Sequence, residues 1–211
     1  MQTAVFADYD GTITDADTFD VLVRACAGDA VWDEIEARLE RGERTLSEAM
    51  QAEAGEVRLS FEDALALLER KVRFDPAFPD YAARCRAAQA SLTVVSSGIE
   101  PLIRLELERH GVGYLPVVAS GLEVTPAGWR LIFRDGPPNG TDKAALVRAA
   151  HERGARTVFI GDGRSDFDAA LVAEVVFAKR GRRLERFLRE RARPFTPFKS
   201  FAEIRVPASV T

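Results

Sequence analysis

The sequence TAVFADYDGTIT, residues 3–14, begins with a short apolar run and continues into a turn that contains two aspartates. An apolar run this short, followed by a glycine-containing turn, is typical of a buried strand. Asp8 and Asp10 lie two residues apart, so both side chains leave the strand end on the same side. Gly11 permits a sharp turn and lets backbone N–H groups approach a bound anion. The stretch predicts a buried strand that presents two carboxylates, although a solvated turn is the alternative for the pair taken alone.

Further apolar runs of strand length recur along the chain, at Leu92–Val95, Pro116–Ala119, Thr157–Ile160 and Val175–Ala178. They are almost continuously apolar rather than alternating, which is typical of parallel strands buried on both faces. Helical stretches at Glu100–His110 and Asp142–Arg153 lie between them. Strands that alternate with helices predict an α/β protein with a Rossmann-like parallel sheet.

Residues 16–75 interrupt this alternation, because they contain helical patterns and no strand candidate. Thr45 and Glu48 have the spacing of a capping box at the start of one of these helices. We therefore expect about four helices inserted after the first strand as a cap, on a core made of residues 1–15 and 76–211. Residues 122–134 predict a β-hairpin off the main sheet, with its turn at the sequence PAG.

The composition excludes several classes of protein. The chain has 211 residues, 46% of them hydrophobic, and a formal net charge of −4, which favours one domain with an insertion and disfavours a nucleic-acid binder. No apolar run approaches the roughly 18 residues of a membrane span, and two histidines cannot form a multi-histidine metal site. Two isolated cysteines and an N-terminus without export-signal character favour the cytoplasm. The oligomeric state stays open, with a homodimer as one option, as does the role of the basic stretch Lys179–Arg193.

Three further motifs lie where a predicted strand ends or a helix begins, which is where open α/β sheets bind ligands. Ser96 is the first residue of the sequence SSG, and its hydroxyl together with exposed backbone amides at a helix N-terminus could bind an anion. The alternative role of Ser96 is that of a helix N-cap. Lys143 can neutralise a phosphoryl group, and a solvated surface lysine is the alternative. The sequence GDGRSD, residues 161–166, places Asp162 and Asp166 beside glycines, an arrangement that suits a hard cation such as Mg²⁺.

The types, order and spacing of these four motifs resemble those of the haloacid dehalogenase superfamily, specifically its phosphatase branch, from Phe6 to about Ile204. The helical insertion is similar to the cap of the phosphoserine phosphatase-like group. Within that group, the DxDGTIT sequence, the cap size and the C-terminal FTPFKSFAEI resemble the methionine-salvage phosphatase that hydrolyses 2-hydroxy-3-keto-5-methylthiopentenyl 1-phosphate. The resemblance implies the fold of that superfamily, with the helical cap inserted after the first strand.

The resemblance also implies a chemical role for each motif. Asp8 would take the phosphoryl group as an aspartyl-phosphate, and Asp10 would protonate the leaving alkoxide and then act as base on water. Asp8, the backbone carbonyl of Asp10, and Asp162 would hold Mg²⁺. This cation and Lys143 would offset the repulsion between Asp8 and a dianionic phosphate. Asp166 would orient the site as a supporting carboxylate.

Substrate binding is expected from a further set of polar side chains: Thr12, Asp17, Arg44, Ser96, Ser97 and Lys143. Ser96 and Lys143 would bind the phosphoryl oxygens and Thr12 would support the phosphate loop, whereas Asp17 and Arg44 are the candidates for substrate specificity. Phosphoserine phosphatases usually carry SGG where this chain has SSG, Asn where it has Ser165, and Glu where it has Asp17. These departures argue against phosphoserine as the substrate.

We therefore expect a Mg²⁺-dependent phosphatase of a small phosphomonoester, with the methionine-salvage enol phosphate as the first candidate. The alternative substrate is phosphoserine or another small metabolite. A phosphomutase would use the same pair of aspartates but would return the phosphoryl group to its product. From another class, a non-catalytic phospholigand-binding protein would keep the fold and lose the reaction, but all four motifs are intact, which argues against it.

Overall fold

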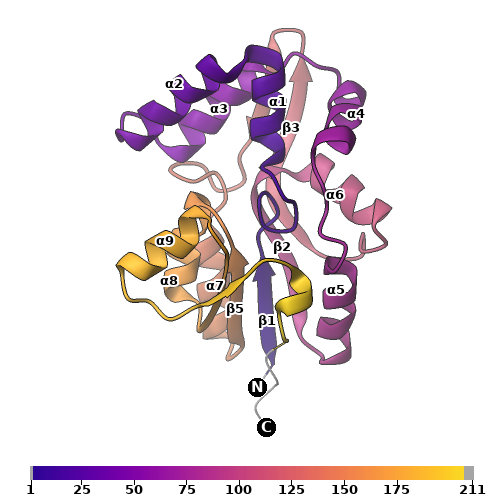
Figure 1. The fold of residues 1–211 in the computed structure, drawn as a ribbon, viewed down its shortest axis with the longest axis vertical. Helices are drawn as coiled ribbons and strands as arrows, with labels where there is room; N and C mark the ends of the chain where they lie inside the picture. Colours follow the sequence, from indigo (N-terminus) through magenta and orange to yellow (C-terminus); the bar gives the residue numbers. More distant parts are fainter. Residues whose placement is uncertain (1, 207–211) are drawn as a thin grey trace.

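The computed structural model describes residues 2–206, in which helices cover both faces of a central sheet (Figure 1). Across these residues one sheet has the strand order β4-β3-β2-β1-β5-β6-β7. Neighbouring strands are parallel except for β3 and β4, which are antiparallel. The strands are β1 (Thr3–Ala7), β2 (Ser91–Ile99), β3 (Val117–Thr125), β4 (Gly128–Ile132), β5 (Arg156–Gly161), β6 (Val175–Lys179) and β7 (Thr196–Phe198). The predicted α/β fold class with a parallel sheet is confirmed.

Alternate residues of the central strand β1 face two separate apolar layers. Val5 and Ala7 pack toward α5 (Phe78–Ala87) and α6 (Glu100–Arg109). Ala4 and Phe6 pack toward the opposite face, which is covered by α7 (Lys143–Glu152), α8 (Phe167–Val172) and α9 (Arg183–Glu190). Burial on both faces explains why this strand is apolar throughout rather than alternating.

The insertion after β1 folds into four helices within the described residues: α1 (Thr18–Ala27), α2 (Asp29–Glu40), α3 (Leu46–Glu56) and α4 (Phe61–Lys71). Thr45 and Glu48 form the predicted capping box at the start of α3. The apolar faces of α1, α3 and α4 share one buried cluster that includes Phe19, Leu22 and Leu68. These helices lie beyond the carboxyl end of β1, over the edge of the sheet where ligands bind in α/β proteins (Figure 1).

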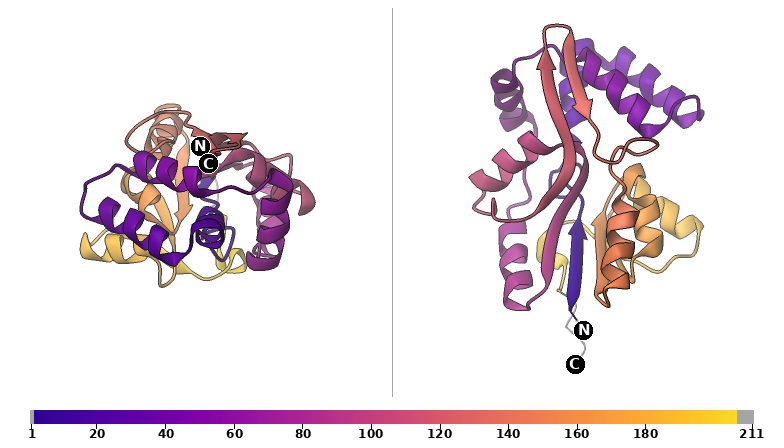
Figure 2. Two further views of the ribbon diagram at one scale, coloured as in Figure 1. Left: turned by 90° about the horizontal axis from the view of Figure 1, so that it is seen from above. Right: turned by 180° about the vertical axis from the view of Figure 1, so that it is seen from behind.

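The predicted hairpin is present, but it is a continuation of the sheet rather than an excursion from it. β3 pairs with β2 up to Ser120 and with β4 from Gly121 onward, so one strand belongs to both pairings. The far part of β3 and β4 rises beside the cap helices (Figure 2). Trp129 of β4 is buried in the apolar cluster of the cap, and its Nε1 donates a hydrogen bond to the Leu59 carbonyl. The hairpin therefore packs with the helices of the insertion.

Two strands differ from the sequence prediction. β2 continues past Val95 to Ile99, with a register shift against β3 between these two residues. β7 pairs with β6 at the sheet edge, although its proline-containing sequence predicts no strand. Among the described residues, no helix combines the length and apolar character that crossing a membrane requires.

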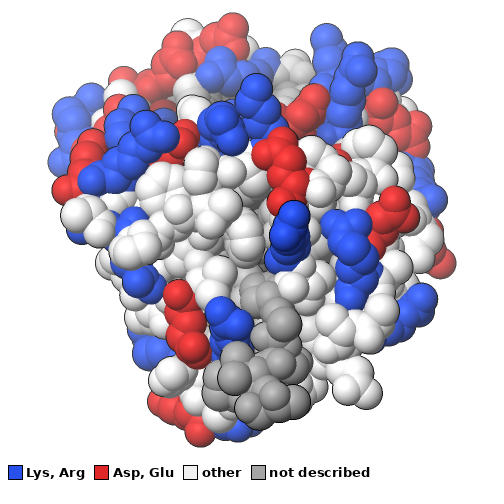
Figure 3. Space-filling model, turned by 60° about the horizontal axis from the view of Figure 1, so that its bottom comes forward, with Lys and Arg blue, Asp and Glu red and all other residues white. Residues whose placement is uncertain are grey.

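The basic stretch Lys179–Arg193 forms the end of β6 and helix α9. Leu184 and Leu188 are fully buried, and Phe187 stacks on Phe167 with ring centroids 3.8 Å apart. The stretch is therefore a surface helix with an apolar inner side. On the face of the molecule that Figure 3 shows, basic and acidic side chains are interspersed.

Candidate active site

The loop after β1 brings the first and fourth motifs together. The Asp8 N–H donates to the Ile160 carbonyl at 2.8 Å, which continues the pairing of β1 with β5. The Tyr9 carbonyl then accepts from Ile13 N at 2.9 Å and closes a tight turn. Gly11 has a φ of +75°, and a Cβ there would overlap the carboxylate of Asp162. Glycine is therefore required at this position both by its backbone angle and by the approach of the fourth motif.

Lys143 lies at the centre of a buried ionic network. Its side chain is 1% exposed, and its Nζ donates to Asp8 Oδ1 at 2.6 Å and to Asp166 Oδ1 at 2.7 Å. A third hydrogen bond reaches Ser165 Oγ at 3.0 Å. Burial alone would lower the pKa of Lys143, but the two carboxylates outweigh it and raise the pKa. The alternative of a solvated surface lysine is wrong, because the first turn of α7 points this residue at the end of β1.

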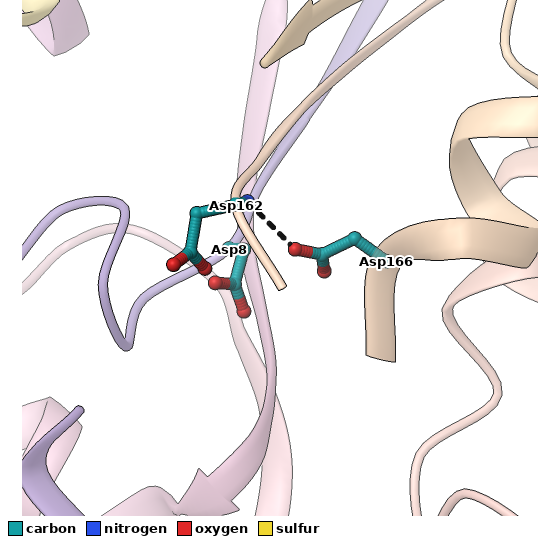
Figure 4. Close-up of side chains that lie close together, drawn as sticks. All are labelled: Asp8, Asp162 and Asp166. Carbon is teal, nitrogen blue, oxygen red and sulfur yellow. Dashed lines mark hydrogen bonds between the residues drawn. The ribbon is translucent and has the colours of Figure 1, made fainter. Parts of the chain in front are cut away.

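Asp166 holds the fourth motif in shape. Its Oδ2 accepts the backbone N–H of Asp162 at 2.8 Å (Figure 4) and that of Gly163 at 2.9 Å. Gly161 leaves room for this carboxylate, because a Cβ at Gly161 would lie 2.5 Å from Asp166 Oδ2. With Lys143 on its other oxygen, Asp166 has no unused oxygen facing the site. Its arrangement fits the predicted supporting carboxylate.

The carboxylates at the floor of the site have the chemistry of a divalent-cation site. One oxygen from each of Asp8, Asp162 and Asp166 lies within 4.8 Å of the others. Asp166 is occupied by its own hydrogen bonds, whereas Asp8 Oδ2 accepts no hydrogen bond from the described residues and Asp162 receives only a 3.4 Å contact from Thr12. Burial, followed by repulsion from neighbouring carboxylates, raises the pKa of Asp8 to about 7. The same two causes, in the same order, raise the pKa of Asp162 above its ordinary value. A hard cation would offset this repulsion, so these residues fit Mg²⁺.

The side chain of Asp10 points away from this cluster. Its Oδ1 accepts the N–H and hydroxyl of Thr18, at 3.0 and 2.5 Å, and its Oδ2 accepts Ser96 Oγ at 3.2 Å. Burial, then the charge of Asp17, raises the pKa of Asp10 to about 7, partly offset by these hydrogen bonds. A carboxyl group that titrates near neutrality can both donate and accept a proton, which suits a general acid and base. A metal role for Asp10 through its backbone carbonyl stays a prediction.

Ser96 and Ser97 lie in the irregular end of β2. Ser96 Oγ accepts the Gly98 N–H at 2.8 Å. The N-cap of α6 is Ile99, so the helix N-cap alternative for Ser96 is wrong. The Ser97 hydroxyl is buried and has no partner among the described residues, and both serines line the cavity described next. A bulge that turns polar groups into a site is a common feature of sheets near ligands.

A cavity of about 460 Å³ separates these residues from the cap. Its floor is formed by Asp8, Asp10, Asp162 and the two serines. Its core-side wall carries three arginines and its cap side mixes apolar and acidic side chains. The arginines are Arg164, Arg182 and Arg183, and the cap residues include Phe19, Asp20, Arg24, Trp32, Glu36, Leu39, Leu46, Met50 and Glu53.

The residues predicted to contact or support the substrate differ in their positions relative to the cavity. Asp17 lines the cavity, but its carboxylate caps α1 by accepting the N–H groups of Phe19 and Asp20. Arg44 lies in the turn before α3 and does not line the cavity, although Leu39 and Leu46, on either side of that turn, do. Thr12 is fully buried behind Asp162, in a supporting position rather than facing a ligand. The predicted substrate contact of Arg44 therefore has no counterpart in this arrangement.

Several residues of the site carry no sequence signal of their own. Thr18 binds Asp10 with two hydrogen bonds, and only its place at the start of α1 would have pointed to it. Arg183 of α9 forms ion pairs with Glu36 and Glu40 of α2, at 3.0 and 3.3 Å, and so joins the core to the cap across the cavity. Glu53 lines the cap side, and nothing in its helical pattern distinguishes it from a surface glutamate.

Comparison with known proteins agrees with this geometry. A 2-hydroxy-3-keto-5-methylthiopentenyl-1-phosphate phosphatase of Microcystis aeruginosa is 30% identical, over 97% of both chains. The polyol phosphate phosphatase PYP1 of Saccharomyces cerevisiae is 28% identical, over 97% of this chain and 91% of the relative. A solved phospho-aspartyl intermediate analogue of phosphoserine phosphatase has the same fold, with a TM-score of 0.71 at 18% identity over 96% of both chains.

A family model also matches most of the chain. The model describes haloacid dehalogenase-like hydrolases and matches residues 5–171, which include the strand ends that carry Asp8, Ser96 and Asp162 and the helix that begins with Lys143. The match agrees with the seven-stranded sheet, with the cavity that Asp8, Ser96 and Asp162 line, and with the ion pair that joins Lys143 to Asp8. The chain belongs to the haloacid dehalogenase-like hydrolases.

Proposed function

We propose that the protein is a Mg²⁺-dependent phosphatase that hydrolyses a small phosphomonoester through an aspartyl-phosphate at Asp8. One observation carries this proposal: the buried Asp8 carboxylate is held by Lys143 at 2.6 Å on the floor of a cavity that Asp162 and Asp10 also line. The names of the relatives support hydrolysis of a small phosphate ester.

The first half of the reaction uses Asp8 as nucleophile. One carboxylate oxygen of Asp8 forms a bond to phosphorus, while the bond from phosphorus to the ester oxygen breaks. Asp10 gives its proton to that oxygen, so that an alcohol leaves rather than an alkoxide. Lys143 balances the charge on Asp8 as it approaches the phosphate, and the Ser97 hydroxyl is free to donate to a phosphoryl oxygen.

The second half returns the enzyme to its starting state. Asp10, now ionised, takes a proton from water as the water oxygen bonds to phosphorus and the bond to Asp8 breaks, which releases inorganic phosphate. Asp8, Asp162 and the Asp10 carbonyl would hold Mg²⁺, which when bound would neutralise phosphoryl charge during both steps. A carboxylate nucleophile divides one difficult hydrolysis into two easier ones.

The substrate is proposed more broadly than a single metabolite. The methionine-salvage enol phosphate is supported by the 30% identity to a phosphatase of that name, and a polyol phosphate by the 28% identity to a polyol phosphate phosphatase. The leaving group would occupy the cap side of the cavity. The two candidate substrates differ in this group, so the residues on the cap side would decide between them.

Phosphate release from a panel of phosphomonoesters, with and without Mg²⁺, tests the proposal. Asp8→Asn should abolish release, while Asp168→Asn, an exposed aspartate on α8, should leave it unchanged as the matched control. Mass spectrometry of rapidly quenched enzyme should find a phosphoryl group on Asp8. Full activity of Asp8→Asn would overturn the mechanism, transfer of phosphate to product without release would indicate a mutase, and Mg²⁺ binding without any turnover would indicate a binding protein.

A further inference from the structure

Glu53 of α3 is an acidic side chain in an unusual position on the cap side of the cavity. The residue is 5% exposed and lines the cavity, yet none of the described residues donates a hydrogen bond to it. The charged groups that act on it are Asp20, Asp17 and Glu36, all of them acidic. A buried carboxylate is normally hydrogen-bonded or paired. Its free oxygens therefore point to a ligand that supplies donors.

Two of the four arginines that line the cavity, Arg24 and Arg183, form ion pairs, whereas Arg164 and Arg182, on the core side, form none with the described residues. Arg183 pairs with Glu36 and Glu40, and Arg24 pairs with Asp29 while its guanidinium lies 3.7 Å from the ring centroid of Trp32. The cap side of the cavity therefore contains acceptors rather than free positive charge. A leaving group that carries a carboxylate would meet repulsion there, without an unpaired arginine on the cap to receive it.

The acceptors are distributed over three helices. Asp20 of α1 accepts one N–H, from Trp32 Nε1 at 2.9 Å, and Glu36 of α2 accepts one from Arg183 at 3.0 Å. Each of these carboxylates keeps further lone pairs, and Glu53 of α3 keeps all of its own. A single ammonium group offers its donors at one point, whereas a chain of hydroxyl groups offers one donor after another along its length.

We propose that the cap side of this cavity selects a polyhydroxylated leaving group that carries no carboxylate, with Glu53 as a specificity-determining residue. The inference rests on the proposed phosphatase function and names its substrate class, a polyol or sugar phosphate. Apolar residues beside the acceptors, among them Phe19, Leu39 and Met50, provide surface for the carbon skeleton. The enol phosphate of methionine salvage has one hydroxyl group, on the carbon next to the phosphate ester, and its thioether end offers no donor to the acceptors of the cap.

Matched substrates test the selection. Glycerol 1-phosphate and n-propyl phosphate differ by two hydroxyl groups, while 3-phosphoglycerate adds a carboxylate and phosphoethanolamine an ammonium. We expect kcat/KM for glycerol 1-phosphate to exceed that of each of the others by at least about tenfold, because a site built for hydrogen bonds rejects analogues that lack them. Equal values for glycerol 1-phosphate and n-propyl phosphate, or a preference for phosphoethanolamine or 3-phosphoglycerate, would overturn the proposal.

Variants of Glu53 connect the preference to this residue. Glu53→Leu should reduce the ratio of kcat/KM between glycerol 1-phosphate and n-propyl phosphate by about tenfold, since the hydrogen bond between Glu53 and a hydroxyl group of the substrate is lost. Glu53→Gln keeps an accepting carbonyl and should retain more of the ratio than Glu53→Leu. Glu34→Gln, at an exposed position of α2, is the control and should leave the ratio unchanged. An unchanged ratio in Glu53→Leu would overturn the role of Glu53.

The generic substrate p-nitrophenyl phosphate separates the two proposals. If the native protein with Mg²⁺ hydrolyses neither this ester nor any member of the panel, the phosphatase function itself is wrong. If it hydrolyses p-nitrophenyl phosphate but does not distinguish glycerol 1-phosphate from n-propyl phosphate, the phosphatase function stands and the inference about the leaving group is wrong.

Discussion

Replacing Glu53 by leucine should stabilise the free protein, because the native carboxyl group is buried without a hydrogen-bond donor. Burial, followed by the charges of Asp20 and Asp17, raises the pKa of Glu53 to about 9 from an ordinary value of 4.5. A buried polar group without a partner costs about 1–3 kcal/mol. Linkage sets an upper limit of about 3.4 kcal/mol at pH 7, since each pH unit above the ordinary pKa costs about 1.4 kcal/mol. We take the cost as about 2 kcal/mol, which lies within both ranges.

The expected readout is the melting temperature. For a protein of this size 1 kcal/mol shifts Tm by about 2–4 °C, so Glu53→Leu should melt about 4–8 °C above the native protein at pH 7. The folded state keeps a proton that the unfolded state loses, so the native protein loses stability as pH rises from about 4.5 toward 9. The difference between native and variant should therefore be larger at pH 8 than at pH 5.

Thermal unfolding followed by circular dichroism, at pH 5 and pH 8, provides the measurement. The melting temperature of Glu53→Gln should lack the pH dependence that Glu53 gives the native protein, as that of Glu53→Leu does. Glu34→Gln should have the melting temperature of the native protein at both pH values. A Glu53→Leu variant that melts at or below the native temperature would show that the carboxylate has a stabilising partner. An identical difference at both pH values would show that Glu53 is not the titrating group.

Three further perturbations test the catalytic floor and the cap. The raised pKa of Asp10, about 7 because of burial and then of Asp17, keeps its proton available up to neutral pH. The turnover of an alkyl phosphate should therefore fall above about pH 7. The turnover of p-nitrophenyl phosphate should fall less, because its leaving group needs no proton. Parallel pH profiles for the two substrates would contradict the role of Asp10 as general acid. Gly11→Ala should reduce kcat by about 100-fold, because the new Cβ would displace the carboxylate of Asp162, a proposed Mg²⁺ ligand. Gly42 has a similar positive φ but open space around it, so Gly42→Ala should cost only about 1–2 kcal/mol of stability. Equal kinetics of the two variants would refute the steric argument. Arg183→Met should raise KM about threefold. The free energy of unfolding should change by no more than about 1 kcal/mol, since the ion pairs of Arg183 are partly exposed. A larger fall in Tm with an unchanged KM would show that these ion pairs are purely structural.

Much of the core could be predicted from the sequence, because a strand that is buried on both faces of the sheet has a continuous run of apolar residues. The strand at Thr3–Ala7 and the capping box at Thr45 are local signals of this kind. The end of β2 could not be predicted, since Ser96–Gly98 has the composition of a turn and is held in the strand by tertiary contacts, among them the bond from Ser120 Oγ to the Ser97 carbonyl. β7 is too short and too poor in apolar alternation to be recognised.

The residues of the candidate site also fall into those that the sequence could predict and those that depend on tertiary packing. Asp8, Lys143 and Asp166 were predictable because each lies beside a strand end or a helix start, and the topology of a parallel sheet brings these positions together. The cap side was not predictable. Which face of α3 faces the cavity depends on how the cap packs on the core, so the sequence analysis did not select Glu53, and it selected Arg44, which does not line the cavity.

The change of partner along β3 has a mechanical consequence. Up to Ser120 this strand pairs with β2, whose end carries Ser96 and Ser97, the serines proposed to bind phosphate, and from Gly121 it pairs with β4, which packs with the cap. The cap is thus joined to the core by a continuous strand as well as by the chain segments around α1 and α4. A movement of the cap relative to the core would have to be accommodated in β3 near Gly121, next to the residue whose side chain is hydrogen-bonded to the Ser97 carbonyl. A ligand on the serines that favoured one cap position would, by linkage, be bound more tightly in that position by the same free energy.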